Sequence, residues 1–345
     1  MARPPALIDL AAYEAYASDP ERLEPGVIAR VRGGAGTGST VRANVEAFGR
    51  WRLASRVLRD VSGIDLTTTV LGAPIELPVF CCPIGAQIWV HPDAELATAA
   101  AAMQAGTIFI RPNLATATPE AIGALGPGRR WQQCEMLPDR GALVRLAARV
   151  QDAGFEALCL TVDRAYKPRR PADLSYPRPE NSLPVAPTDP SFTWRDVSAL
   201  ASSIGIPLVL KGISHPADAR LAVESGAAAI VVSNHGGNQL DGARATLEVI
   251  GEISAAAEGR IDVLMDGGVR CGPDVVKALA LGARAVGIGR PLMWGLAHSG
   301  ASGVGDILTI LRLELIDTLG LLGVASVAAV DGAVVRRHGC GCGCG

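Results

Sequence analysis

Short apolar segments rich in β-branched residues recur along this chain and alternate with alanine-rich segments of helical period. Each apolar segment predicts a buried strand, because a strand covered on both faces reads as a continuous hydrophobic run. The expected strands are residues 77–80, 107–110, 130–134, 157–162, 207–210, 229–232, 261–265 and 285–288. The expected helices between them include residues 94–104, 141–152, 216–224 and 273–281.

This alternation predicts an α/β protein. About eight β/α units fit a (β/α)8 TIM barrel, and an open doubly wound sheet is the alternative. We expect an N-terminal extension over residues 1–75, with a helix from Leu10 to Ala17, and a barrel over residues 76–322. Residues 323–345 would form a C-terminal segment, and the proline-rich stretch 174–192 predicts a long surface loop.

The composition of the chain limits the kinds of molecule that it is expected to bind. With 49% hydrophobic residues the chain can bury a large core, which excludes a mostly disordered protein. The net charge of −2 offers no basic surplus for nucleic acid or for a membrane surface, so we expect a small-molecule partner. No apolar run approaches the ~18 residues of a spanning helix and no signal peptide is evident, which predicts a cytoplasmic protein.

The eight cysteines fall into two groups. Five are scattered through apolar or turn segments without metal-ligand spacing, so we expect them to be structural and expect no metal site. The other three alternate with glycine from Gly339 to Gly345. This tail is interpreted as a site for a metal or another thiol, as a site of modification, or as an appendage without a role.

Polar residues concentrate where the expected strands end, and in a barrel the chemistry lies at the carboxyl ends of the strands. Glycine-flanked turns beside Arg270 and Arg290 offer backbone N–H donors and guanidinium groups, which together bind a phosphate. His235 follows one strand and Asp163 another, and a histidine beside a carboxylate can accept a proton. Lys211, at a third strand end, can stabilise an anion in the barrel mouth.

The segment from Ser233 to Gly242, Ser-Asn-His-Gly-Gly-Asn-Gln-Leu-Asp-Gly, resembles the signature of the FMN-dependent α-hydroxy-acid oxidase and dehydrogenase family. Further segments resemble that family in the same order, namely residues 64–72, 160–163, 210–212, 266–270 and 288–291. The resemblance extends from about residue 7 to residue 320. It implies a TIM barrel, FMN as the cofactor and a homo-oligomer, commonly a tetramer.

The resemblance also implies a role for each matched residue. His235 corresponds to the catalytic base, Asp163 to the carboxylate that steadies its imidazolium, and Lys211 to the group that stabilises the anionic reduced flavin. The residues implied to bind FMN are Pro83, Gly85, Gln133, Thr161, Lys211, Ser233, Asp266, Gly268, Arg270, Gly289 and Arg290.

The residues expected to contact the substrate depart from the family pattern. Asn238 stands where the family has an arginine that clamps the substrate carboxylate, and a neutral amide cannot replace that pair. Arg30 and Glu135 stand in place of two tyrosines. Arg30 either restores carboxylate binding or lies in solvent, and Glu135 either holds an amine or pairs with Arg30 or Arg164. Arg170 retains the second arginine by which the family contacts the substrate carboxylate. The complete set expected to bind substrate is Arg30, Glu135, Arg170, Asn238 and His235.

The resemblance implies oxidation of a CH–OH or CH–NH2 carbon by hydride transfer to the flavin, with a carbanion route through the same histidine as the alternative. The departures predict a substrate other than a simple short 2-hydroxy acid. Gly237-Asn238 and segments 292–296 and 306–308 resemble a branch that contains pre-mycofactocin synthase, which implies a natural-product or peptide-derived substrate. The alternatives are an ordinary L-2-hydroxy-acid oxidase or dehydrogenase, and a protein that binds FMN without catalysis. Retention of the histidine, the aspartate and the lysine together argues against the last alternative.

Overall fold

The computed structural model describes residues 6–338, so the Gly-Cys tail lies outside the described residues. Eight parallel strands form a closed barrel in the order β10-β11-β4-β5-β6-β7-β8-β9. The pairing of β11 with β4 closes the barrel, which confirms the predicted TIM barrel and excludes the open sheet. The barrel strands are β4 (Val79–Cys81), β5 (Phe109–Arg111), β6 (Arg130–Glu135), β7 (Ala157–Thr161), β8 (Leu208–Ile213), β9 (Ala229–Val232), β10 (Asp262–Asp266) and β11 (Val286–Ile288).

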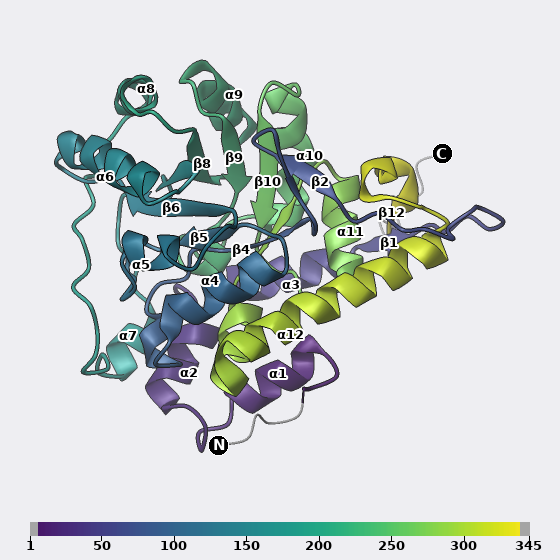
Figure 1. Ribbon diagram of the computed structural model, residues 1–345, viewed down its shortest axis with the longest axis horizontal. Helices are drawn as coiled ribbons and strands as arrows, with labels where there is room; N and C mark the ends of the chain where they lie inside the picture. The colour runs from purple at the N-terminus through teal and green to yellow at the C-terminus, as the bar shows by residue number, and fades with distance from the viewer. Residues whose placement is uncertain (1–5, 339–345) are drawn as a thin grey trace.

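Helices surround the barrel, and α1, α4 and α12 lie side by side along one flank (Figure 1). The helices before the barrel are α1 (Leu10–Ala17), α2 (Pro25–Arg32) and α3 (Ser39–Gly49). Those that follow its strands are α4 (Ala94–Gln104), α5 (Pro119–Gly123), α6 (Arg140–Asp152), α7 (Pro171–Ser175), α8 (Trp194–Ser203), α9 (Pro216–Glu224), α10 (Thr246–Ala257), α11 (Gly272–Ala280) and α12 (Arg290–Leu322). Short 3-10 turns are η1 (Gln87–Trp89), η2 (His235–Gly237), η3 (Val327–Ala329) and η4 (Gly332–Val334).

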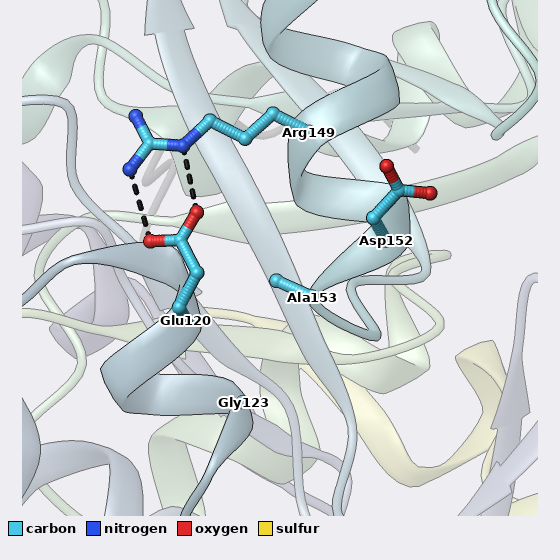
Figure 2. A pocket seen from close by; sticks show the side chains of 5 residues that line it. All are labelled: Glu120, Gly123, Arg149, Asp152 and Ala153. Atoms are coloured by element: carbon cyan, nitrogen blue, oxygen red, sulfur yellow. Dashed lines mark hydrogen bonds and ion pairs between the residues drawn. The ribbon is translucent and has the colours of Figure 1, made fainter.

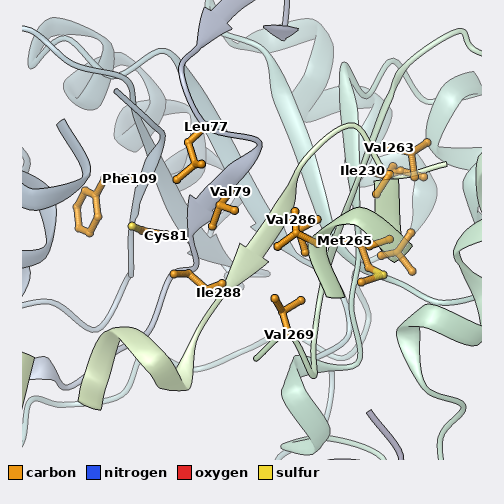
Figure 3. Close-up of a cluster of buried hydrophobic side chains, with 14 of the residues drawn as sticks. Leu77, Val79, Cys81, Phe109, Ile230, Val263, Met265, Val269, Val286 and Ile288 are labelled. Atoms are coloured by element: carbon orange, nitrogen blue, oxygen red, sulfur yellow. The ribbon is translucent and has the colours of Figure 1, made fainter. Parts of the chain in front are cut away.

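Alternate residues along each barrel strand face opposite sides, as the two-residue period of a strand requires. One set points outward beneath the helices, and Figure 3 shows part of it, including Val79, Cys81, Phe109 and Met265. The other set points to the barrel axis and forms the interior cluster, which includes Phe80, Trp131, Cys159, Val209, Val231 and Leu264. The next inward position beyond each of these residues therefore lies at the carboxyl-terminal mouth of the barrel.

The amino-terminal end of the barrel is closed by the hairpin of β2 (Thr68–Val70) and β3 (Ala73–Ile75). Val70 and Ile75 of this hairpin belong to the interior cluster, so the hairpin fills that end of the barrel. Strand β1 (Trp51–Leu53) pairs with β12 (Val335–Arg337), which joins the segments before and after the barrel. The exact division of the chain into an extension, a barrel and a C-terminal segment stays a prediction.

All eight expected strands are present, and α1, α4 and α9 have the predicted bounds. The structure adds helices such as α8 and α10, which were not predicted, and the expected loop 174–192 begins with the last residues of α7. Cys81 and Cys159 are buried free thiols whose pKa burial raises to about 12, as expected of structural cysteines. None of the helices described between residues 6 and 338 is long and apolar enough to cross a membrane.

Candidate active site

A ring of buried polar side chains lies directly above the interior cluster. Gln133, Thr161, Lys211, Ser233 and Asp266 each stand two residues beyond an interior-cluster residue, and each is at most 5% exposed. Burial of several polar groups in one layer costs free energy unless they are hydrogen-bonded. The ring meets this requirement in part through the Gln133 Nε2 atom, which donates to Thr161 Oγ1 at 2.9 Å. We call these five residues the polar ring.

Lys211 is the only cation in the polar ring and is held by two of its members. Its Nζ atom lies 2.6 Å from Asp266 Oδ2 and donates to Ser233 Oγ at 2.8 Å, and Ser233 Oγ donates to Asp266 Oδ1 at 2.7 Å. Burial disfavours the charged lysine, but the adjacent Asp266 carboxylate outweighs that effect and raises the pKa of Lys211. Lys211 is therefore a charged ammonium group that is paired with the Asp266 carboxylate.

His235 and Asp163 form a pair above this ring, with 3.2 Å between His235 Nδ1 and Asp163 Oδ1. The φ of His235 is +58°, a left-handed conformation that is uncommon for a residue with a side chain and that recurs at functional sites. Burial opposes ionisation of Asp163, but the charge and hydrogen bond of His235 and the charge of Lys211 outweigh it and lower the pKa of Asp163. Gly212 makes room for this carboxylate, because a Cβ atom there would lie 2.7 Å from Asp163 Cβ and Cγ.

Two half-buried arginines, Arg270 and Arg290, stand beyond the ends of β10 and β11. Arg290 donates to three backbone carbonyls and Arg270 lies over the ring of Trp294, yet within residues 6–338 neither forms an ion pair with a carboxylate. Burial lowers the pKa of Arg270, and burial with repulsion from Arg270 and Arg170 lowers the pKa of Arg290 to about 10. Gly289, the N-cap of α12, places a helix N-terminus beside them. Uncompensated guanidinium groups at a helix N-terminus suit a phosphate.

The N-terminal extension holds the loop that carries the histidine. Asn44 of α3 and Asn234 exchange two side-chain hydrogen bonds, each 2.8 Å long. Asp241 accepts hydrogen bonds from the hydroxyls of Ser39 and Thr37, both at 2.7 Å, and these bonds lower the pKa of Asp241. Asn44 could not be predicted from the sequence, because a polar residue inside a helix forms no motif.

Arg170 is the expected carboxylate anchor and lies against the same loop, where its Nε atom donates to the Asn238 backbone oxygen at 3.1 Å. Among the described residues its two terminal nitrogens have no hydrogen-bond partner. The Asn238 side chain turns back into its own loop and donates to the His235 backbone oxygen at 3.0 Å. The structure thus brings Arg170, Asn238, His235 and Asp163 together.

Glu135 pairs with Arg164, which is one of the three partners considered for it. Its Oε1 atom accepts a hydrogen bond from Arg164 Nη1 at 2.6 Å and a longer one from Gln133 Nε2 at 3.3 Å. Arg164 directly follows Asp163 in the sequence, and that adjacency was the available signal that it belongs to the mouth.

Arg30 does not lie in solvent, because its side chain is only 8% exposed. Its Nε atom donates to Asp173 Oδ1 at 3.2 Å and its Nη2 atom to the Tyr176 backbone oxygen at 2.7 Å. A third bond runs from Nη1 to Gly26 of the same helix. These partners tie the loop after β7 to α2, and a role for Arg30 in substrate binding stays a prediction.

Two of the glycines predicted to bind the cofactor are also demanded by packing. A Cβ atom on Gly85, which follows β4 together with Pro83, would lie 2.9 Å from Leu114 Cβ. Gly268 has a φ of +85°, and a Cβ atom there would collide with the Asn44 backbone oxygen. Packing alone therefore accounts for glycine at these two positions.

A separate surface hollow lies between α5 and α6 on the outside of the barrel (Figure 2). Its main feature is an exposed ion pair in which Arg149 donates to Glu120 through Nε at 2.7 Å and Nη2 at 2.9 Å. None of the polar-ring residues lines it, so we place the active site at the barrel mouth.

The fold and this mouth define a barrel enzyme that holds a phosphate-bearing cofactor at its strand ends. The sequence profile described as FMN-dependent dehydrogenase matches residues 20–337. L-lactate oxidase of Nostoc sp. is 42% identical over 328 residues, which cover 86% of this chain and 90% of the relative. Human 2-hydroxyacid oxidase 1 is 37% identical, with 97% of this chain and 98% of the relative covered.

Solved structures of hydroxy-acid oxidases also resemble this chain. The crystal structure of mandelate oxidase with 3,3-difluoro-2-hydroxy-3-phenylpropionic acid superposes with a TM-score of 0.92 at 40% identity and covers 96% of this chain and 100% of that chain. The chain belongs to the FMN-dependent dehydrogenase family. The expected likeness to the branch of pre-mycofactocin synthase stays a prediction.

FMN is the cofactor of this family, and the residues of the mouth fit it. The two uncompensated arginines, Arg270 and Arg290, would hold its phosphate beside Gly289. The polar ring offers Lys211 as a cation and several hydrogen-bonding groups for the ribityl chain and the flavin ring. The structure thus brings the predicted FMN residues to one end of the barrel, while their individual roles stay predictions.

Proposed function

We propose that this protein oxidises L-2-hydroxy acids to 2-keto acids with FMN as its cofactor. The observation that carries the proposal is the His235–Asp163 pair, which stands beside Arg170 and above Lys211. The relatives support it, since they include a lactate oxidase and a 2-hydroxyacid oxidase. On the sequence alone this activity is an alternative; the main expectation is a substrate other than a simple short 2-hydroxy acid.

The charge and the position of each residue at the barrel mouth determine its proposed role in the reaction. Because His235 Nδ1 is bonded to Asp163, the Nε2 atom is the one that accepts the proton of the substrate hydroxyl. Asp163, ionised by its lowered pKa, then stabilises the imidazolium. The terminal nitrogens of Arg170 bind the substrate carboxylate. FMN, when bound, supplies the acceptor for the hydride from C2, and Lys211 provides a positive charge near it.

A second candidate is the oxidation of an amine in a larger, natural-product or peptide-derived substrate. Two observations favour it: Asn238 contributes no charge to the mouth, and Glu135 adds a buried carboxylate there. Both features weaken the attraction for a small acid and would suit a cationic group.

The test is anaerobic mixing of the FMN-loaded protein with L-lactate, glycolate and L-mandelate in parallel with primary amines. We expect the hydroxy acids to bleach the flavin absorption and the simple amines to leave it unchanged. Bleaching by amines alone would replace the first proposal by the second. Cytoplasmic location and a homotetramer accompany both candidates as predictions.

A further inference from the structure

Glu135 is the last residue of β6 and lies at the mouth of the barrel. Trp131, four residues before it, belongs to the interior cluster, and Gln133, two residues before it, belongs to the polar ring. Because side chains on a strand alternate with a period of two, Glu135 faces the barrel axis one step above the ring. Its Cα partner on the neighbouring strand β7 is Thr161, a member of the polar ring.

The Glu135 carboxylate is buried, and among the described residues only one of its two oxygens accepts hydrogen bonds. Its side chain is 6% exposed, and its Oε1 atom takes the hydrogen bonds of Arg164 and Gln133. The Oε2 atom is buried and has no hydrogen-bond partner within residues 6–338. A buried charged acceptor without a partner is unfavourable, so this oxygen calls for a donor that the described chain does not supply.

The geometry of a 2-hydroxy acid says which part of the substrate can supply that donor. Its central carbon carries a carboxylate, a hydroxyl, a hydrogen and a side chain. Under the proposed function, Arg170 takes the carboxylate, His235 takes the hydroxyl proton and the hydrogen leaves to the flavin. The side chain of the substrate is the group that these assignments leave without a partner.

We propose that Glu135 selects 2-hydroxy acids whose side chain carries a hydrogen-bond donor, either a hydroxyl or an amino group. An ionised carboxylate only accepts hydrogen bonds, so an aliphatic side chain would leave Oε2 unsatisfied. Arg164 binds Oε1 at 2.6 Å, which leaves Oε2 for the substrate. This inference rests on the proposed hydroxy-acid oxidation and adds the substrate class.

Three acids of nearly equal size test the inference on the FMN-loaded enzyme. They are L-2-hydroxypentanoate, L-2,4-dihydroxybutyrate and L-4-amino-2-hydroxybutyrate, which differ in a terminal methyl, hydroxyl or ammonium group. We expect kcat/KM for flavin reduction by at least one donor-bearing acid to exceed that of 2-hydroxypentanoate by about tenfold or more. Equal values for all three acids, or a preference for the methyl group, would overturn the inference.

Two variants locate the preference at this carboxylate. Glu135→Leu removes the acceptor and should abolish the preference, whereas Glu135→Gln keeps an acceptor and should retain it for the hydroxyl but weaken it for the ammonium group. Glu95→Gln is the matched control, since Glu95 is a buried glutamate of α4. Its Oε2 atom accepts a hydrogen bond from Thr116, and its Oε1 atom has no hydrogen-bond partner among the described residues. This control variant should leave the preference unchanged. If the preference survives in Glu135→Leu, the inference is wrong.

Binding provides a readout apart from turnover. The matched 2-keto acids should perturb the oxidised flavin spectrum with an affinity that follows the same order, and Glu135→Leu should remove that order. A changed flavin spectrum in Glu135→Gln without any change in this order would mean that Oε2 faces the cofactor, which contradicts the inference. If no hydroxy acid bleaches the flavin at all, the proposed function itself fails, whereas equal bleaching by all three acids removes only the inference.

Discussion

The two sides of the barrel mouth differ in how they are built. The side assigned to the cofactor consists largely of inward-facing strand residues such as Lys211 and Asp266, whose positions follow from the strand period. The side assigned to the substrate depends on loop residues such as Arg170 and Asn238, and there the sequence predicts a departure from the family pattern at Asn238. The comparison indicates that the barrel preserves one chemistry while its loops and strand tips change what that chemistry acts on.

The largest expected effect separates catalysis from cofactor binding. His235→Ala removes the proton acceptor but none of the residues proposed to hold FMN. Turnover of the best hydroxy acid should fall at least ~10²-fold while the bound flavin and its spectrum stay unchanged. Stopped-flow reduction together with flavin content measures both quantities, and unchanged turnover would remove His235 from the mechanism.

Asp163→Asn should have the next largest effect, because a neutral amide cannot stabilise the imidazolium. We expect turnover to fall by about 10- to 100-fold. The pKa of Asp163 is lowered from its ordinary value of 3.8, so its ionised form stabilises the fold above that pH and this contribution is lost as the pH falls through the lowered pKa. Melting temperatures measured against pH should therefore show the wild type and the variant converging below about pH 4; parallel curves would contradict the assignment.

Arg30→Ala tests whether the loop after β7 is held over the substrate side. Loss of the bonds to Asp173 and Tyr176 should raise KM and speed proteolytic cleavage between residues 164 and 192 by about tenfold, with kcat nearly unchanged. Arg30→Lys keeps the charge but loses the planar guanidinium group. Its KM and its cleavage rate should therefore lie between those of the wild type and those of Arg30→Ala. A loss of kcat with an unaltered cleavage rate would instead support a direct catalytic contact.

The smallest effect is expected from a variant that weakens the anchoring of the loop that carries His235. Asp241→Asn weakens the bonds from Ser39 and Thr37, which are exposed or only partly buried. Thermal denaturation should show a modest loss of stability, with substrate preference unchanged. A changed preference would show that this anchor also shapes the substrate side.

Much of this architecture could be predicted from the sequence, because buried parallel strands leave a strong apolar pattern and their ends mark the mouth. The residues of the polar ring follow from that pattern alone. The partners of Arg30 could not be predicted, since Asp173 and Tyr176 lie far away in the chain and carry no motif. The same holds for Glu135, whose three possible partners could be distinguished only by the three-dimensional positions of Arg30 and Arg164.

The most direct test of the account is a crystal structure of the enzyme with FMN and a 2-keto acid bound. We expect the phosphate between Arg270 and Arg290, the keto-acid carboxylate on Arg170, and the keto oxygen beside His235 Nε2. A flavin bound elsewhere, or a keto acid that contacts neither Arg170 nor His235, would contradict the account.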